Sequence, residues 1–482
     1  MRGFIISLIH FSFSILAASA VWSATFNVSN PTEFQAALTT AQSNGEDDTI
    51  NVAPGTYNIT SILTYTTNDG DGSLTIQAQD IKNKPILDGQ NNVSHLHIHN
   101  DDDNDKTGDE GQKITIKGLI FKRGRYGGGI HVETGKADIL IENSEFIENL
   151  QEGGGGVTAI SDSGTITIRN NIFTKNGALG GGGVYAGTGS GTIKLLDNTF
   201  SENTADLYAG GAFLQTESGT INIRGNTFSQ NTAKRNAGGL YVDSYSGLIE
   251  LDGNVFSGNS ALGDGSTEPN GGGGALLSAN QWMVIMTNNI FYENHATDYA
   301  GGAAGVTSAG YLVITNNTFY GNTAGNKAGG LLGWLESDSS HMIIYNNIVY
   351  SNSAGGNDGD DIYVESDKDG NGTGAEVKLK NNDLTGNANF NTAQSEDLLI
   401  TDTDKYSHAN NIQENPLFKD PAKGNLHIKR ASPCRNAGSN SALGLPSKDF
   451  DGQSRIIGGT VDIGADEYKP AEPWIPMLLL GD

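Results

Sequence analysis

Apolar side chains recur at a fixed spacing through the middle of the chain. Phe146, Phe173 and Phe200 lie 27 residues apart, and the interval becomes 28 from Phe200 to Phe228 and from there to Phe256. Each interval also holds a short run in which apolar and polar residues alternate, which is the period of a half-buried β-strand. A fixed period of this length indicates a stack of similar units. The hydrophobic pattern therefore predicts a repeat protein.

Each repeat unit carries three strand signals separated by turn signals. Around Phe200, Ile193 and Leu195 alternate in the first strand, Phe200 marks the second, and the third begins after Gly210-Gly211. Three short strands in 27 or 28 residues describe one triangular coil, which pairs in parallel with the next coil about 4.8 Å away. We therefore predict an all-β fold, a parallel β-helix.

The recurring residues have structural explanations. Stacked phenylalanines would form an internal ladder of buried aromatic surface. The asparagine three residues later, such as Asn203 after Phe200, tolerates left-handed turns, and its amide can bond the next amide along the rod. The Gly pair allows a sharp bend at the third strand. We interpret this phrase as a feature of the scaffold.

The first ordered element is expected to be a helix that caps the solenoid. Asn30 suits the N-cap, Pro31 the first helical position and Glu33 a capping box, and the apolar spacing that follows is helical. A solenoid leaves open backbone groups on its first rung, and such a helix covers them. We predict one short helix at about 31–43.

The chain divides by pattern into five parts. Residues 1–20 are typical of a secretory signal peptide, with Arg2, an apolar run and the cleavage motif Ala18-Ser19-Ala20. That run is too short for a comfortable membrane span, and no transmembrane span is expected in the mature chain. The predicted parts are the signal peptide at 1–20, an N-terminal cap with irregular first coils at 21–120, regular repeats at 121–390, C-terminal coils with a cap at 391–468, and an apolar tail at 469–482.

The net charge and the cysteine content limit which classes of partner and which cellular compartment fit this chain. The formal net charge of −26 argues against nucleic acid as a partner and allows bound cations. Cys434 is the single cysteine, so no internal disulfide can form. Exported proteins of this size without disulfides fit a bacterial envelope. We expect a protein that is secreted or held on the outer surface of a bacterial cell.

The repeat resembles that of the polymorphic outer membrane proteins of chlamydiae. The resemblance implies a right-handed parallel β-helix of the pectate-lyase type, displayed on a cell surface as an adhesin-like rod. No residues remain for the C-terminal translocator barrel of that family. The similarity is carried by the F-x-x-N phrase and its Gly pairs at Phe173/Asn176, Phe200/Asn203, Phe228/Asn231, Phe256/Asn259, Phe291/Asn294 and Phe319/Asn322.

The end of the chain resembles a second bacterial domain, the choice-of-anchor type found after β-helices. This resemblance implies a secreted or surface-held protein and no particular activity. The matching residues are Ser432-Pro433, Ala437-Gly438, Asp451-Gly452, Arg455 and the stretch 461–468.

Two acidic stretches are candidate calcium sites. Asp367, Asp369 and Asn371 match the first half of a calcium loop, but the closing glutamate is missing. A plain acidic turn explains them equally well. Asp360 and Asp361 replace the usual Gly pair, and with Asp358 they form a second, weaker candidate (Asp358, Asp360, Asp361).

Histidines and aromatic residues supply the other candidates. In 95–99 the alternating His95, His97 and His99 are expected to share one strand face, either as a transition-metal site or as a polar outer face. We favour the polar face. Tyr185, Phe213 and Tyr241 are expected to point outward on three consecutive coils. Such a ladder could bind a polysaccharide along the rod, or its rings could simply stabilise the sheet by stacking on one another.

The favoured function is non-enzymatic. We predict a β-helix that binds polysaccharide or a cell-surface glycan, adhesin-like, or that serves as a structural rod. The alternative is a calcium-assisted polysaccharide lyase or epimerase, which needs carboxylates and an Arg or Lys together on one outer face. Arg123 and Arg125 beside His131 form the best basic cluster in the sequence.

Overall fold

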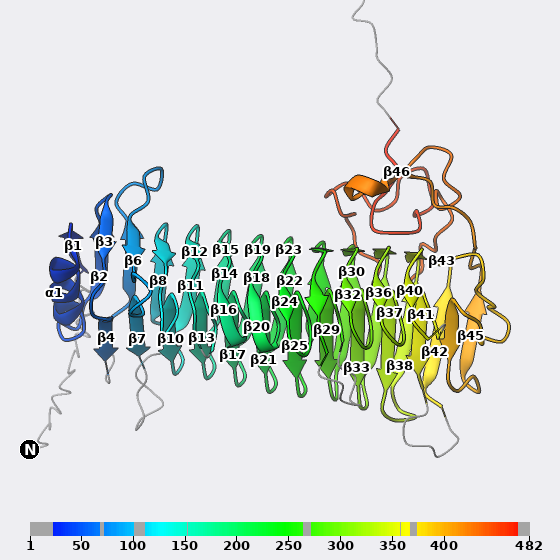
Figure 1. Cartoon of the computed structure of the whole chain (residues 1–482), viewed down its shortest axis with the longest axis horizontal. Coiled ribbons are helices and arrows are strands. Elements are labelled where there is room, and N and C mark those ends of the chain that lie inside the picture. Colours follow the sequence, from blue (N-terminus) through cyan, green and yellow to red (C-terminus); the bar gives the residue numbers. More distant parts are fainter. Residues whose placement is uncertain are drawn as a thin grey trace, which may run out of the picture.

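The computed structural model shows a long solenoid whose coils stack along one axis (Figure 1). It describes residues 23–67, 72–100, 111–151, 153–263, 271–356, 358–366 and 374–470. The predicted signal peptide and most of the apolar tail lie outside these residues. Within them, successive coils pair in parallel, in three sheets of 14, 12 and 12 strands that run along the rod and a fourth of 7 strands that is confined to its middle coils. The predicted all-β parallel β-helix is confirmed.

Sheet A contains the first strand of each coil. Its inward residues are those predicted from alternation: Ile193, for example, pairs in register with Ile166 and with Ile221. In order along the rod it consists of β1 (Ser23–Val28), β2 (Asp47–Val52), β5 (Leu74–Ala78), β8 (Lys113–Lys117), β11 (Asp138–Glu142), β14 (Ile166–Arg169), β18 (Thr192–Leu196), β22 (Thr220–Arg224), β26 (Ile249–Asp252), β30 (Met283–Thr287), β34 (Tyr311–Thr315), β38 (His341–Tyr345), β42 (Glu376–Lys380) and β45 (Tyr406–Ala409).

Sheet B contains the strand that carries the repeated phenylalanine. The rings of Phe173, Phe200 and Phe228 stack inside the solenoid with centroids 4.7 Å apart and planes within 5° of parallel. The sheet consists of β3 (Thr56–Asn58), β6 (Ile86–Asp88), β9 (Ile120–Lys122), β12 (Glu145–Ile147), β15 (Ile172–Thr174), β19 (Thr199–Ser201), β23 (Thr227–Ser229), β27 (Val255–Ser257), β31 (Ile290–Tyr292), β35 (Thr318–Tyr320), β39 (Ile348–Tyr350) and β43 (Asp383–Leu384).

Sheet C follows the Gly pairs. Gly211 shows why glycine is needed there: a Cβ would lie 2.5 Å from the carbonyl oxygen of Gly239 and 2.8 Å from the ring of Phe228. The sheet consists of β4 (Leu63–Thr67), β7 (Leu96–Asn100), β10 (Ile130–Thr134), β13 (Val157–Ser161), β17 (Val184–Thr188), β21 (Ala212–Thr216), β25 (Leu240–Ser244), β29 (Ala275–Ala279), β33 (Ala303–Thr307), β37 (Leu331–Leu335), β41 (Ile362–Glu365) and β44 (Leu398–Ile400).

Sheet D is a fourth sheet, where the sequence predicted three strands per coil. It lies between the asparagine turn and the Gly pair, and five of its strands contain only two residues, too few to show an alternating pattern. Its buried alanines, such as Ala205 and Ala233, pair in register. The sheet consists of β16 (Gly177–Gly180), β20 (Thr204–Tyr208), β24 (Thr232–Ala233), β28 (Ser260–Ala261), β32 (His295–Ala296), β36 (Thr323–Ala324) and β40 (Ser353–Ala354).

Two ladders of buried asparagines run beside the phenylalanine stack. In one of them the Asn203 Nδ2 donates to the Asn231 Oδ1 (2.9 Å) and to the Phe173 carbonyl (2.9 Å), while the Asn203 backbone N–H donates to the same Asn231 Oδ1 (3.0 Å). The same pattern repeats on successive coils, so the predicted amide ladder is confirmed. Each amide is both donor and acceptor, which satisfies the buried turn completely.

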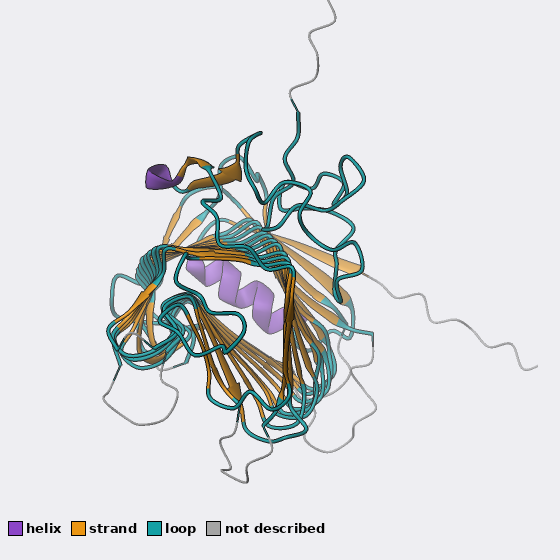
Figure 2. Ribbon diagram, turned by 90° about the vertical axis from the view of Figure 1, so that its right-hand side faces the viewer, coloured by secondary structure: helices purple, strands orange, loops and turns teal. Residues whose placement is uncertain are grey.

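The helix α1 (Pro31–Ala41) covers the first coil, as predicted, and ends two residues earlier than expected. The Asn30 side chain accepts from the Glu33 backbone N–H, and the Glu33 carboxylate accepts from the Ser29 backbone and hydroxyl. Phe34 and Leu38 are among the residues that its buried face adds to the core. The end-on view shows this helix lying across the opening of the solenoid (Figure 2).

The C-terminal segment (413–470) packs against the side of the solenoid. Phe418 and Ile463 join a separate hydrophobic cluster with Ile290 and Ile348 of sheet B, whereas Ala388 and other residues of the last coils join the main core. Its elements are β46 (Phe418–Asp420), a 3₁₀ turn (Pro421–Lys423) and β47 (Asn425–Ile428). The coils up to 412 therefore close the end, and the segment after them lies along the outer wall (Figure 1). None of the helices in the described residues is long and apolar enough to cross a membrane.

Candidate functional site: the outer face of sheet C

The second residue of each strand in sheet C faces outward. This places Tyr185, Phe213 and Tyr241 side by side on β17, β21 and β25, where we name them the aromatic column. The rings of Phe213 and Tyr241 stack at 4.9 Å, and those of Tyr185 and Phe213 meet edge to face at 5.4 Å. The structure therefore brings the three predicted ligand-binding residues together on one outer face.

The ring of Tyr185 lies differently from the other two. Its plane is turned 68° from that of Phe213, and its atoms lie 3.3–3.7 Å from the position that a Cβ would take on Gly187, the next outward residue of the same strand. The ring thus lies over a glycine, close to the strand. The Tyr185 hydroxyl donates to the Gln215 Oε1 (3.3 Å) in an exposed position. Tyr185 offers a flat platform with a polar rim.

The column becomes more buried toward the C-terminal end of the rod. Tyr208 of β20 contacts the rings of Phe213 and Tyr241 at 6.1 and 5.8 Å, and burial raises the pKa of Tyr241. On the following coils the outward positions hold buried residues, among them Leu276 and Leu332. Here sheet D and its turns cover the outer face of sheet C. The accessible part of the column is its N-terminal end, at Tyr185.

A histidine cluster precedes the aromatic column on the same face. It consists of His97, His99, His131 and Glu133, since β10 pairs in register with β7. The Glu133 Oε2 lies 3.4 Å from the His99 Nδ1 and 3.6 Å from the His131 Nε2, and the His97 and His131 rings are 5.6 Å apart. His131 joins it from the next coil, 34 residues after His97, so the regular spacing does not reveal the pair.

His95 does not belong to this cluster, which corrects the expectation that three alternating histidines share one face. His95 precedes β7, at a corner of the coil, and is buried against the edge of Phe121. Its Nε2 contacts the Lys122 carbonyl (2.9 Å) and its Nδ1 the Gly129 carbonyl (3.3 Å). Burial lowers the pKa of His95, in keeping with a structural role.

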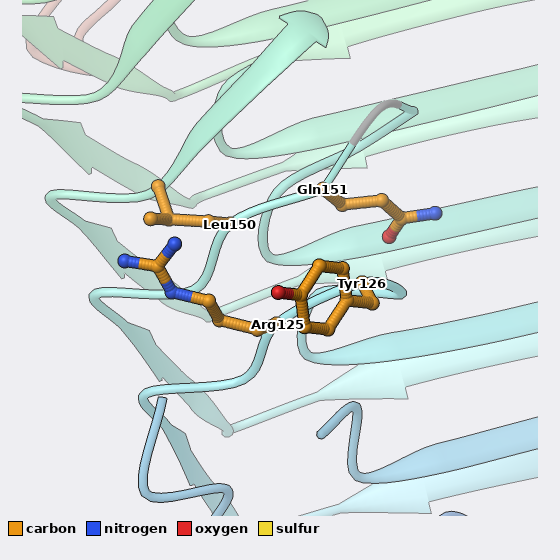
Figure 3. Close-up of a pocket in the computed structure, with 4 residues that line it drawn as sticks. All are labelled: Arg125, Tyr126, Leu150 and Gln151. Atoms are coloured by element: carbon orange, nitrogen blue, oxygen red, sulfur yellow. The ribbon is translucent and has the colours of Figure 1, made fainter. Parts of the chain in front are cut away.

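A shallow hollow lies beside these two features. Arg125 and Tyr126 on one coil face Leu150 and Gln151 on the next, around a space of about 480 Å³ (Figure 3). A second hollow continues past Leu150 and Gln151 to the first strands of sheet D. Tyr126 is 87% exposed. Arg123, predicted to join Arg125 in a basic cluster, instead pairs with the Asp88 carboxylate.

Of the predicted cation-binding residues, the structure describes the second candidate, Asp358, Asp360 and Asp361. Asp367, Asp369 and Asn371 lie outside the described residues, so that calcium loop stays a prediction. Asp361 is buried: its Oδ1 accepts from the Asn352 Nδ2 (2.9 Å) and its Oδ2 from the Thr385 N–H (2.7 Å). It ends the asparagine ladder, and burial raises its pKa to about 7. Asp360 accepts from the Ala354 N–H, and Asp358 forms a backbone bridge with Lys327.

In the part of the chain that the structure describes, one group of metal-binding side chains is compact. The ligand atoms of His427, Asp451 and Asp466 lie within 4.8 Å of one another. Sequence reasoning missed this group because its members are far apart in an irregular segment. The repeated acidic residues at 449–451 and 462–467 were the available signal.

A cleft between sheet A and the C-terminal segment is lined by carboxylates and a guanidinium. Arg224 on β22 and Asp252 on β26 are register partners, and Glu250 lies on the same outer face. The segment 444–447 forms the opposite wall of this space of about 420 Å³. The Asp252 Oδ1 accepts from the Thr287 hydroxyl (2.8 Å), so that carboxylate already has a partner.

Comparison with known families supports the architecture and no specific activity. The model of a family described as right-handed β-helix region matches residues 67–228 and 210–412, which together exceed half of the chain. A comparison with curated proteins found no match. The stacked parallel coils and this match agree, and the chain belongs to the right-handed β-helix family.

Proposed function

We propose that this protein is a secreted or surface-associated bacterial β-helix that binds polysaccharide or cell-surface glycan on the outer face of sheet C. The observation that carries the proposal is the position of Tyr185, whose ring lies over Gly187 at the accessible end of the aromatic column. The C–H groups on one face of a pyranose ring pack on such a flat aromatic surface, and nearby hydroxyl and amide groups orient the sugar.

The surroundings of Tyr185 fit an extended ligand. Gln215 supplies an amide beside the ring, and the hollow around Arg125 and Tyr126 lies on coils toward the N-terminal end of the same rod. Tyrosine and arginine are the side chains that contribute most to binding surfaces. Arg125 supplies a guanidinium that can pair with a carboxylate or another acidic group of a glycan.

Binding to a panel of immobilised polysaccharides tests this proposal, followed by calorimetry with the strongest ligand. We expect Tyr185→Ala to weaken binding about tenfold, which is about 1.4 kcal/mol, and Tyr185→Phe to keep most of the affinity. Tyr245, an exposed tyrosine in the turn after β25, provides the matched control Tyr245→Ala. The proposal fails if no glycan binds, or if Tyr185→Ala and Tyr245→Ala bind equally well.

Export is part of the proposal. It is supported by the signal-peptide pattern at 1–20, by the single cysteine and by the resemblance to surface-displayed repeat proteins. Expression of the full chain in a Gram-negative host, followed by fractionation and N-terminal mass analysis, tests it. Recovery of an unprocessed chain from the cytosol would contradict it.

A second candidate function is that of a polysaccharide lyase or epimerase. The observation that favours it is the cleft between sheet A and the C-terminal segment, which Arg224 lines. Two carboxylates and a guanidinium line that cleft, which are the groups that stabilise charge at C5 of a uronic acid and move its proton. Incubation with acidic polysaccharides, with and without calcium, would show unsaturated products by their absorbance. Activity lost in Asp252→Asn and kept in Tyr185→Ala would favour this candidate over pure binding.

A further inference from the structure

Three polar side chains that could hold a metal ion converge in the C-terminal segment. His427 lies on β47, Asp451 in the turn 449–453 and Asp466 just after the strip 463–465 that docks on the solenoid. Their nearest ligand atoms all lie within 4.8 Å of one another. Three chain segments that are distant in sequence therefore meet at one point.

The hydrogen bonds of His427 orient its ring. The Asn425 Oδ1 accepts from the His427 backbone N–H (3.3 Å) and lies 2.8 Å from the His427 Nδ1, so the Nδ1 carries a proton and donates. The Nε2 then points at the Asp451 Oδ2, 3.1 Å away. In a neutral imidazole this nitrogen holds a lone pair, which a carboxylate oxygen repels. A cation between the two atoms removes that repulsion.

Asp466 provides the second, independent observation. Its side chain is only 8% exposed, and its Oδ1 is buried with no hydrogen-bond partner. Leaving a buried carboxylate oxygen unpaired is costly. The neighbouring carboxylates differ: Asp449 accepts from the Gln453 and Glu467 N–H groups, and Asp462 accepts from those of Asn436 and Tyr468. Asp466 and its neighbour Glu467 each keep one buried carboxylate oxygen without a hydrogen-bond partner, and Asp466 is the one of the two that belongs to the cluster.

The charges around the group favour a dication. Asp449 and Asp451 place two further carboxylates near Asp466, with the Lys419 ammonium as a nearby positive charge. Asp451 is an exposed residue and Asp466 a buried one, so the group is closed on the protein side and open toward solvent. An ion there can keep water as a further ligand.

We propose that His427, Asp451 and Asp466 bind a divalent transition-metal ion, with zinc as the best fit. Imidazole nitrogen with carboxylate oxygen suits Zn²⁺ better than Ca²⁺, which prefers six to eight oxygens. At bonds of about 2.0–2.1 Å, two tetrahedral ligands lie about 3.3 Å apart. The 3.1 Å pair is close to this spacing, and the ligand atom of Asp466, which lies within 4.8 Å of the other two, would move closer to complete the set. Asn425 acts as the positioning residue that sets the tautomer.

The consequence is a clamp on the C-terminal segment. This segment has little regular secondary structure, and the ion would tie the hairpin of β46 and β47 to the turn 449–453 and to the docking strip. Metal binding that joins three distant parts of the chain stabilises the folded arrangement over the open one. The site is separate from the aromatic column and does not depend on glycan binding.

The test uses tag-free full-length protein that has been stripped with a chelator and dialysed. Calorimetry with ZnCl₂ should give one ion per chain, and Co²⁺ should give visible absorption bands of a bound site. Asp466→Asn and His427→Ala should each weaken zinc binding at least 100-fold, and Asn425→Ala about 10–100-fold. The control is His341→Ala, which removes a histidine from a His–Glu pair on sheet A and should change nothing.

Circular dichroism of each variant separates loss of the ligand from loss of the fold. Asn425 is exposed, so Asn425→Ala should fold normally and still weaken zinc binding. The proposal is overturned if the wild type binds no zinc, if it binds Ca²⁺ in preference to Zn²⁺, or if folded Asp466→Asn and Asn425→Ala bind zinc as the wild type does.

Discussion

The regular coils and the C-terminal end of this molecule bury polar groups in opposite ways. In the coils around Phe228 the buried polar side chains are neutral amides and hydroxyls, and the amides are hydrogen-bonded to the neighbouring coils. From Asp361 onward, carboxylates are buried as well, among them Asp361, Asp383 and Asp466. Neutral ladders can be repeated without limit, whereas each buried carboxylate needs its own set of donors or a cation. The stability of the middle coils should therefore depend little on pH or on cations, whereas the stability of the C-terminal end should depend on both.

The largest expected effect concerns the middle of the solenoid. Phe228→Ala should remove a ring that stacks on both sides, at 4.7 and 4.8 Å, and lower the free energy of unfolding by about 3–5 kcal/mol. Denaturant unfolding followed by circular dichroism measures the loss. Phe213→Ala, on the outer face, should cost clearly less. Equal costs for the two changes would mean that the internal stack is not a main source of stability.

The asparagine ladder should be nearly as important as the ring stack. Asn231→Ala would leave the Asn203 N–H and Nδ2 without their acceptor and the Phe200 carbonyl without its donor. We expect a loss of about 2–4 kcal/mol. Asn222→Ala, which removes an amide from the outer face of sheet A, is the matched control and should cost at most about 0.5 kcal/mol. Similar losses at both sites would contradict the ladder's role.

The end of the solenoid should respond to pH. Burial raises the pKa of Asp361 to about 7 and that of Asp383 to about 6, from an ordinary value of 3.8. Between about pH 4 and 7 the folded chain therefore holds more protons than the unfolded chain, and stability falls as pH rises through this window. Hydrogen exchange, corrected for intrinsic rates, should show faster opening of the coils at 352–400 at pH 8 than at pH 5.

The coils at 198–260 serve as the internal reference for this pH experiment, since their ladder is made of amides. Asp361→Asn should remove much of the pH dependence at the end and leave the middle as it was. Equal pH dependence at 198–260 and at 352–400 would mean that the buried carboxylates do not make the end of the solenoid more sensitive to pH than the amide ladder.

The smallest expected effect concerns the outer face of sheet C. Gly187→Val should lift the ring of Tyr185 from the strand and weaken glycan binding several-fold, without a change in the internal core. Gly386→Val, at a glycine whose Cβ would meet nothing within 4 Å, is the control for a Gly-to-Val change. Unchanged affinity in Gly187→Val would show that glycan binding does not depend on the position of the Tyr185 ring.

The sequence predicted what repetition makes visible. The register of Phe200 on Phe228, the amide ladder and the capping by Asn30 all follow from spacing and local chemistry, and the structure confirms them. Sheet D escaped prediction because two-residue strands such as Thr232–Ala233 show no period. His95 was placed on the wrong face because the alternation was extended one residue beyond the start of β7.

The irregular end resisted prediction for a different reason. The side-on position of the C-terminal segment depends on contacts between residues far apart in sequence, such as the Asn316 Nδ2 with the carbonyls of Asp462 and Gly464. No period or local motif encodes these contacts. The convergence of His427, Asp451 and Asp466 is a product of the same folding back.

Asp361 has a consequence for the length of the rod. Every asparagine of its ladder donates toward the next coil, so the amide dipoles point one way and an unfinished ladder would present open donors at its growing end. A carboxylate only accepts, and Asp361 therefore works as a terminator that a further copy of the unit cannot extend. The rod can be lengthened by inserting whole units before this position, which makes its length a modular trait open to duplication.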